Sequence, residues 1–138
     1  MSWRTQLVEA AERLEAKTRR KRWTDRTEVL LECDFVVGAY AMQKLLRSAP
    51  PSDQQAARRI PVRRLDTGYD LELSRRDTIT VADLCQHVLN NSVFDFYCGE
   101  TADLFDGIYI GRGEGKNVLL VIASDFIALC NDLGTQTV

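Results

Sequence analysis

The sequence predicts an α+β fold: two long N-terminal helices, a small hairpin, a third helix, a three-stranded antiparallel meander and a C-terminal helix. Apolar residues recur at helical spacing through the first third of the chain. Short β-branched and aromatic runs, separated by turn residues, follow in the last third. The 138 residues, of which 45% are hydrophobic and 28% charged, fit a single domain over 1–138.

The two N-terminal helices are the strongest elements of the pattern. The first is expected over residues 3–21, and the second from Thr24 or Asp25 to about Arg47. The second is apolar on most of its sides, which predicts a central buried helix. Gly38 lies in its middle and costs about 1 kcal/mol relative to alanine. We therefore expect another element to pack closely against Gly38.

A hairpin is expected over residues 59–73. Its first strand is predicted at residues 60–62 and its second at residues 69–73, where apolar and polar residues alternate. Pro61 has no backbone N–H to donate to a ladder, which predicts that its strand lies at a sheet edge.

The second half of the chain is predicted to contain a helix, a meander and a closing helix. Thr78 or Thr80 is the expected N-cap of the third helix. The last strand is apolar on both faces, as in a central or covered strand. The closing helix is expected to begin after a Ser124 cap and to end at Gly134. The three strands are predicted at residues 93–97, 107–110 and 117–123.

Charge is distributed unevenly along the chain. Residues 1–76 hold 16 Lys and Arg against 11 Asp and Glu, a net charge of +5. Residues 77–138 hold two basic residues against nine acidic ones, a net charge of −7. The overall net charge of −2 is therefore the sum of a basic N-terminal face and an acidic C-terminal face. Such asymmetry favours docking to a charged partner or between two copies of the chain.

Two carboxylates, Glu32 and Asp34, interrupt the apolar second helix. A buried carboxylate needs a cationic partner or a raised pKa. We expect both to accept arginine side chains from the pairs within residues 58–64 or at 75–76, or from a partner chain. Replacing either carboxylate is then expected to lower the melting temperature.

One set of side chains on the third helix is a candidate catalytic site. Asp83, His87 and Asn91 are spaced four residues apart, so they lie along one helix face. A histidine near a carboxylate can act as a general base, for example toward a ribose 2′-hydroxyl. An ordinary solvated face explains the same polar residues, because the apolar stripe of this helix lies on its other side.

A basic run provides a second candidate, for nucleic-acid binding. Cationic side chains grip phosphates and an aromatic ring can stack on a base. Against this, the isoelectric point near 5.4 is low for a nucleic-acid-binding domain, and basic residues at a helix C-terminus favour its dipole. The candidate residues are Arg19, Arg20, Lys21, Arg22 and Trp23.

Several function classes have little support. The glycine-rich segment 111–117 lacks the spacing of a phosphate-binding loop and leads into a predicted strand. One histidine and four cysteines without a CxxC pair predict no metal site, and no motif predicts a cofactor. The charged N-terminus and the absence of a long apolar run predict neither a signal peptide nor a membrane span. Buried, reduced cysteines suit a cytosolic protein, so a cytoplasmic location is expected.

These observations favour a non-enzymatic, cytosolic protein-interaction module. It is expected to form a homodimer or to be a subunit of a small bacterial complex. The alternative is a nucleic-acid-acting protein, such as a toxin- or defence-type ribonuclease that uses His87. A third hypothesis is a small-molecule-binding domain with a pocket between its sheet and its second helix, although no motif distinguishes it.

Overall fold

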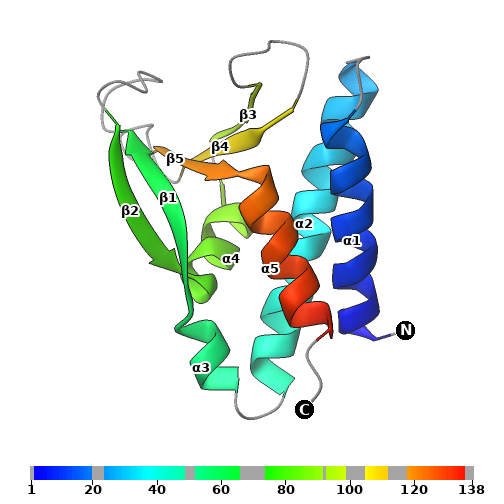
Figure 1. Cartoon of the computed structure of the whole chain (residues 1–138), viewed down its shortest axis with the longest axis vertical. Coiled ribbons are helices and arrows are strands. Elements are labelled where there is room, and N and C mark those ends of the chain that lie inside the picture. Colours follow the sequence, from blue (N-terminus) through cyan, green and yellow to red (C-terminus); the bar gives the residue numbers. More distant parts are fainter. Residues whose placement is uncertain are drawn as a thin grey trace.

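The computed structural model has an α+β fold, as predicted, with helices and a five-stranded sheet (Figure 1). It describes residues 2–19, 24–48, 52–65, 74–91, 93–98, 105–111 and 118–135. The elements, in chain order, are α1 (Trp3–Thr18), α2 (Asp25–Ser48), α3 (Ser52–Ala56), β1 (Arg59–Leu65), β2 (Arg75–Thr80), α4 (Val81–Leu89), β3 (Val93–Tyr97), β4 (Gly107–Gly111), β5 (Val118–Ile122) and α5 (Ala123–Thr135).

The strands form one antiparallel sheet in the order β2-β1-β5-β4-β3. The two halves of the chain meet where β1 pairs with β5, with Arg63 opposite Leu120 and Leu65 opposite Val118. The predicted hairpin and meander are therefore parts of a single sheet. β5 lies at its centre, which confirms the expectation drawn from its apolar residues on both faces.

The hairpin differs from the prediction in its second strand. That strand is β2, at residues 75–80, whereas the predicted residues 69–73 lie outside the described part of the chain. β1 is not an edge strand, because it lies between β2 and β5. Pro61 nevertheless has a neighbour on one side only: it pairs with Thr78 of β2, and the ladder to β5 begins at Arg63. The proline is thus accommodated where β1 is locally unpaired on one side.

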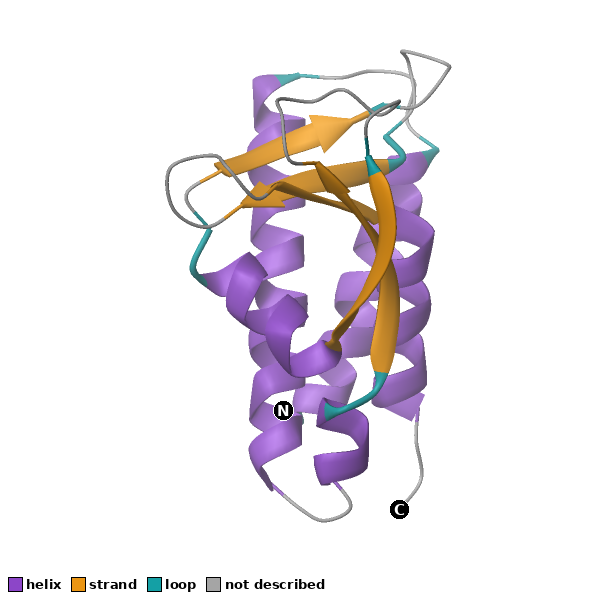
Figure 2. Ribbon diagram, turned by 90° about the vertical axis from the view of Figure 1, so that its left-hand side faces the viewer, coloured by secondary structure: helices purple, strands orange, loops and turns teal. Residues whose placement is uncertain are grey.

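The long helices cover one face of the sheet, and Figure 2 shows the strands in front of them. Strand residues on the helix side, such as Ile60, Ile108 and Val121, join Phe35 and Phe126 of the helices in the main core. The opposite face carries a smaller apolar cluster to which no described helix contributes. It consists of Leu65, Tyr109, Val118 and Leu120, with Tyr97 and Ile122 packed against it.

Threonine side chains cap the N-termini of two helices. Thr24 Oγ1 accepts a hydrogen bond of 3.2 Å from the backbone N–H of Thr27, which caps α2. Thr80 Oγ1 accepts one of 3.1 Å from the N–H of Asp83, which confirms Thr80 as the cap of α4. α5 starts at Ala123, directly after β5, and therefore begins before the predicted Ser124 cap.

Two glycines permit close helix packing. A Cβ on Gly38 would lie 3.1 Å from Cε1 of Phe126, so α5 approaches α2 closely there, as expected. A Cβ on Gly134 would lie 2.8 Å from Cγ2 of Val8. The prediction that Gly134 ends the closing helix is wrong, since α5 continues to Thr135 and uses this glycine to contact α1.

Asp34 is buried between α1 and α2 and carries two cationic partners. Its Oδ1 accepts from Arg13 Nε at 2.8 Å and its Oδ2 from Lys17 Nζ at 2.6 Å. The partners come from one face of α1, so the expected pairing with arginines of residues 58–64 or 75–76 is wrong. Glu32 is exposed, which corrects the expectation that it too is buried. Two of the predicted arginines bond elsewhere: Arg58 to Asp132 and Arg64 to Asp77.

Candidate interaction surface

α2 exposes a row of apolar side chains on the side away from the core. The residues are spaced by four, three and four positions, which places them on one face of the helix. Val29 is 63% exposed, Val36 36% and Tyr40 43%, and the Cys33 side chain between them is also exposed. We call these four residues, Val29, Cys33, Val36 and Tyr40, the α2 stripe.

The other side of α2 supplies the core contacts. Leu31, Phe35 and Met42 are fully buried and follow a second row of helical spacing. The expectation of a helix buried on most sides is therefore wrong: α2 has a core face and an exposed apolar face. A continuous exposed apolar patch is typical of an interaction site rather than of scattered surface residues.

Aromatic and cationic contacts order one end of the α2 stripe. The rings of Trp3 and Tyr40 meet edge to face, with centroids 5.4 Å apart and an interplanar angle of 76°. Lys44 Nζ lies 5.3 Å from the centroid of the Tyr40 ring. Trp3 remains 39% exposed, so this end presents ordered aromatic surface. Aromatic groups of this kind dominate the binding energy of protein interfaces.

The two ends of α2 differ in charge. Asp25 and Glu32 are exposed near its N-terminal end, with Arg26 as the exception, and Lys44 and Arg47 lie near its C-terminal end. This arrangement also complements the helix dipole. Two such helices attract each other when they run antiparallel, because the acidic end of each then faces the basic end of the other.

The predicted catalytic residues lie on α4 and bond within it. His87 Nδ1 lies 2.8 Å from the main-chain oxygen of Asp83, and Asn91 Nδ2 donates to the main-chain oxygen of Val88 at 2.7 Å. In the described residues, no contact joins the carboxylate of Asp83 or the amide of Asn91 to the imidazole. The three residues share a helix face but do not form a hydrogen-bonded catalytic group.

The predicted nucleic-acid-binding run is described only at its start. Arg19 is exposed, and its Nη2 lies 2.9 Å from Oε1 of Glu15, one helical turn away. The remaining four residues of this candidate site, Arg20, Lys21, Arg22 and Trp23, lie outside the described residues.

No protein-family model matches the chain, and neither a curated protein nor a solved structure shows significant similarity to it. Among the helices that the structure describes, none combines the length and the apolar character needed to cross a lipid bilayer. The α2 stripe is therefore the surface from which function is inferred.

In a single copy of the chain, Cys33 is expected to react with a thiol reagent well before the other three cysteines. Cys85 and Cys130 are buried, and burial raises the pKa of Cys85 to about 12 and that of Cys130 as well. Burial, and then the nearby Asp106 carboxylate, also raise the pKa of Cys98. Because the thiolate is the reactive form, at pH 8 the thiolate population of Cys85 is on the order of 10³ below that of an ordinary thiol.

A colour assay with an aromatic disulfide at pH 8 checks this order. At a protein concentration low enough to keep the chain monomeric, the folded protein is expected to release one equivalent of the coloured thiolate rapidly, and four equivalents after denaturation. Cys33→Ser should abolish the rapid phase. A second thiol that reacts as fast as Cys33 in the folded protein would contradict the assignment.

Proposed function

We propose that this protein is a protein-interaction module that forms a homodimer through the α2 stripe. The observation that supports this function is the row of exposed apolar side chains on α2, above all Val29 with 63% exposure. Fully burying a side chain such as valine is worth about 1.5–3 kcal/mol. In a single copy of the chain these side chains remain exposed to water and do not gain this free energy. A second copy can bury them against its own α2 stripe.

A symmetric antiparallel pair satisfies both the apolar and the charged residues of α2. In a two-fold dimer, residue i of one copy faces residue j of the other, and j faces i. With the axis between Cys33 and Val36, Val29 faces Tyr40 of the second copy. The same register brings Asp25 opposite Lys44, so that opposite charges flank the apolar centre. A parallel pair would instead bring like charges together.

Light scattering on a sizing column tests the dimer. At tens of micromolar we expect a mass about twice the 15.6 kDa of one chain. The double variant Val29→Glu/Val36→Glu is expected to be a monomer, because it buries four carboxylates in the interface. The matched control, Ala16→Glu/Ala82→Glu, makes the same charge change at exposed helical residues outside the stripe and should stay dimeric. A monomeric wild-type protein would overturn the proposal.

A charge swap tests the antiparallel arrangement. Asp25→Lys and Lys44→Asp are each expected to weaken dimerisation about two- to fivefold per altered pair, since exposed ion pairs contribute 0.2–1 kcal/mol. The double variant should restore most of the affinity, because each pair regains opposite charges. Failure of the double variant to recover would contradict this register while leaving the dimer itself intact.

Other features fit the same function. All four cysteines are free thiols, which is typical of a reducing compartment such as the cytoplasm. A ribonuclease built on His87 lacks comparable support, because within the described residues neither the Asp83 carboxylate nor the Asn91 amide contacts the imidazole. The module is therefore proposed as non-enzymatic, acting through association with a second copy.

A further inference from the structure

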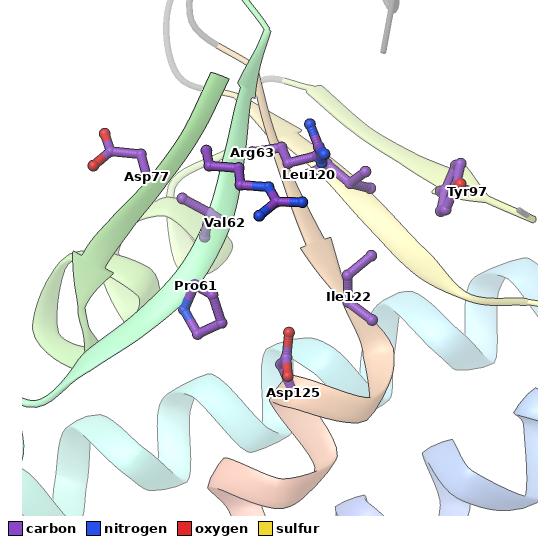
Figure 3. Close-up of a pocket in the computed structure, with 9 residues that line it drawn as sticks. Pro61, Val62, Arg63, Asp77, Tyr97, Leu120, Ile122 and Asp125 are labelled. Atoms are coloured by element: carbon purple, nitrogen blue, oxygen red, sulfur yellow. The ribbon is translucent and has the colours of Figure 1, made fainter. Parts of the chain in front are cut away.

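The sheet face opposite the helices is hollowed between the β1–β2 hairpin, β5 and the start of α5 (Figure 3). The cavity measures about 600 Å³, which lies within the range of small-molecule pockets. Pro61, Leu120 and Ile122 give it an apolar surface, and Tyr97 lies on the far side from Pro61. We call this cavity the outer-face pocket.

Two arginines lie side by side in the outer-face pocket. Arg63 of β1 and Arg76 of β2 are directly opposite each other in the ladder, and both line the cavity. Like charges in this position destabilise a sheet. Arg63 donates from Nη1 to Ser74 Oγ at 2.8 Å, but within the described residues neither arginine forms an ion pair. Their neighbour Arg64, by contrast, pairs with Asp77.

A carboxylate lies at another wall of the same cavity. Asp125 comes from the first turn of α5 and is close to Pro61 and Ile122 in Figure 3. It is partly buried, and this burial raises its pKa. No hydrogen bond or ion pair engages its carboxylate in the described part of the chain. It therefore remains available to accept a hydrogen bond from a bound molecule.

We propose that the outer-face pocket binds a small amphipathic oxyanion that also carries a hydrogen-bond donor. The oxyanion, a carboxylate or a phosphate, lies between Arg63 and Arg76, whose guanidinium groups match its planar or tetrahedral oxygens. The apolar body of the ligand rests on Leu120 and Ile122. The donor group reaches Asp125. The bound anion relieves the repulsion between the two arginines, neither of which has a carboxylate ion-pair partner among the described residues.

Titration followed by amide NMR tests the site with four simple probes: benzoate, phenyl phosphate, inorganic phosphate and benzylamine. Benzoate or phenyl phosphate is expected to shift the amides around Arg63, Arg76 and Leu120, and the tighter of the two identifies the preferred oxyanion. Inorganic phosphate should bind more weakly because it has no apolar body. Benzylamine, which has no oxyanion, should not bind at these amides.

Matched variants locate the contact. Arg76→Gln is expected to weaken binding of the preferred probe about tenfold, as loss of a charge-assisted contact does. Arg75→Gln removes the same charge from the adjacent residue of β2, whose side chain points to the other face of the sheet. It should leave the affinity unchanged. If both variants weakened probe binding equally, the binding would reflect general charge attraction, and the proposed site would be wrong.

Replacing Asp125 is expected to change the affinity for two related probes in opposite directions. Asp125→Asn should preserve or improve the binding of benzoate, because the variant no longer repels an anion. The same variant should weaken 4-(aminomethyl)benzoate, which carries both the oxyanion and the donor. A change in the same direction for both probes would contradict the role of Asp125. Titration of the Val29→Glu/Val36→Glu variant separates this result from dimerisation, because the two surfaces share no residue.

Discussion

Asp34→Ala is expected to lower the free energy of unfolding by about 3–5 kcal/mol, the usual cost of removing one partner from a buried ion pair. The reason is the Lys17 ammonium, whose side chain is only 9% exposed and would lose the carboxylate 2.6 Å away. Arg13 suffers less, because its side chain is 41% exposed and can turn to solvent. The melting temperature should fall by roughly 10 °C or more. Urea and thermal unfolding measure both quantities.

Glu32→Ala is the matched control for Asp34→Ala. It removes a carboxylate from the same helix at an exposed position, so the stability should change by no more than about 0.5 kcal/mol. The double variant Lys17→Met/Asp34→Leu is expected to recover much of the loss, because it leaves no uncompensated buried charge. Equal losses for the two single variants would show that the Asp34 pairing does not stabilise the fold.

Gly107→Ala is expected to destabilise the protein by about 1–3 kcal/mol, as overpacking of a close contact does. A Cβ at this position would lie 2.5 Å from the main-chain oxygen of Val121. That oxygen belongs to the central strand β5, where Val121 pairs with Ile108 of β4, and it cannot move without disturbing this ladder. The midpoint of urea unfolding should therefore fall while its slope stays unchanged.

Gly38→Ala tests whether the obstacle at Gly107 is the rigid main chain. The nearest atoms to its new Cβ are ring carbons of Phe126 at 3.1 Å and 3.2 Å, and a side chain can adjust more easily than a strand. Alanine also gains about 1 kcal/mol of helix propensity over glycine. The loss should be smaller than for Gly107→Ala. A larger loss at Gly38 would contradict this explanation.

Periodicity predicted most of the elements but not β2. The helices α1, α2, α4 and α5 and the three strands of the meander lie close to their expected ranges, because their apolar residues repeat clearly, whereas the short helix α3 was not predicted. β2 has the sequence Arg-Arg-Asp-Thr-Ile-Thr, in which Ile79 is the only buried residue. Its strand conformation is determined by pairing with β1, which lies earlier in the chain. Local sequence carries little signal of such a tertiary contact.

The candidate interface was predictable only in part. The sequence indicated that α2 is rich in apolar residues and that this favours association. It did not indicate which face is free, because the row containing Leu31 and Phe35 and the row containing Val29 and Val36 have the same character. Packing against α1 and α5 buries the row that contains Leu31 and Phe35 and leaves the other row exposed. A helix with two apolar rows is the signal that points to an external partner.

The outer-face pocket was less accessible to sequence reasoning. Its polar groups come from β1, β2 and α5. They lie close together because of the strand register, which cannot be predicted from the sequence. The arginine pairs at 63–64 and 75–76 were expected to pair with the carboxylates of Glu32 and Asp34. Alternation along a strand separates each pair, so that Arg63 and Arg76 share one face while Arg64 and Arg75 share the other.

The central position of β5 also sets the order in which the sheet can be completed during synthesis. When residue 117 leaves the ribosome, β1 with β2 and β3 with β4 can form only as two separate ribbons, each with an open edge. β5 then joins both ribbons by pairing with β1 on one side and β4 on the other. Such non-local pairing is a slow step in folding. β5, which is made after the other four described strands of this sheet, is therefore the strand that joins the two ribbons into one sheet.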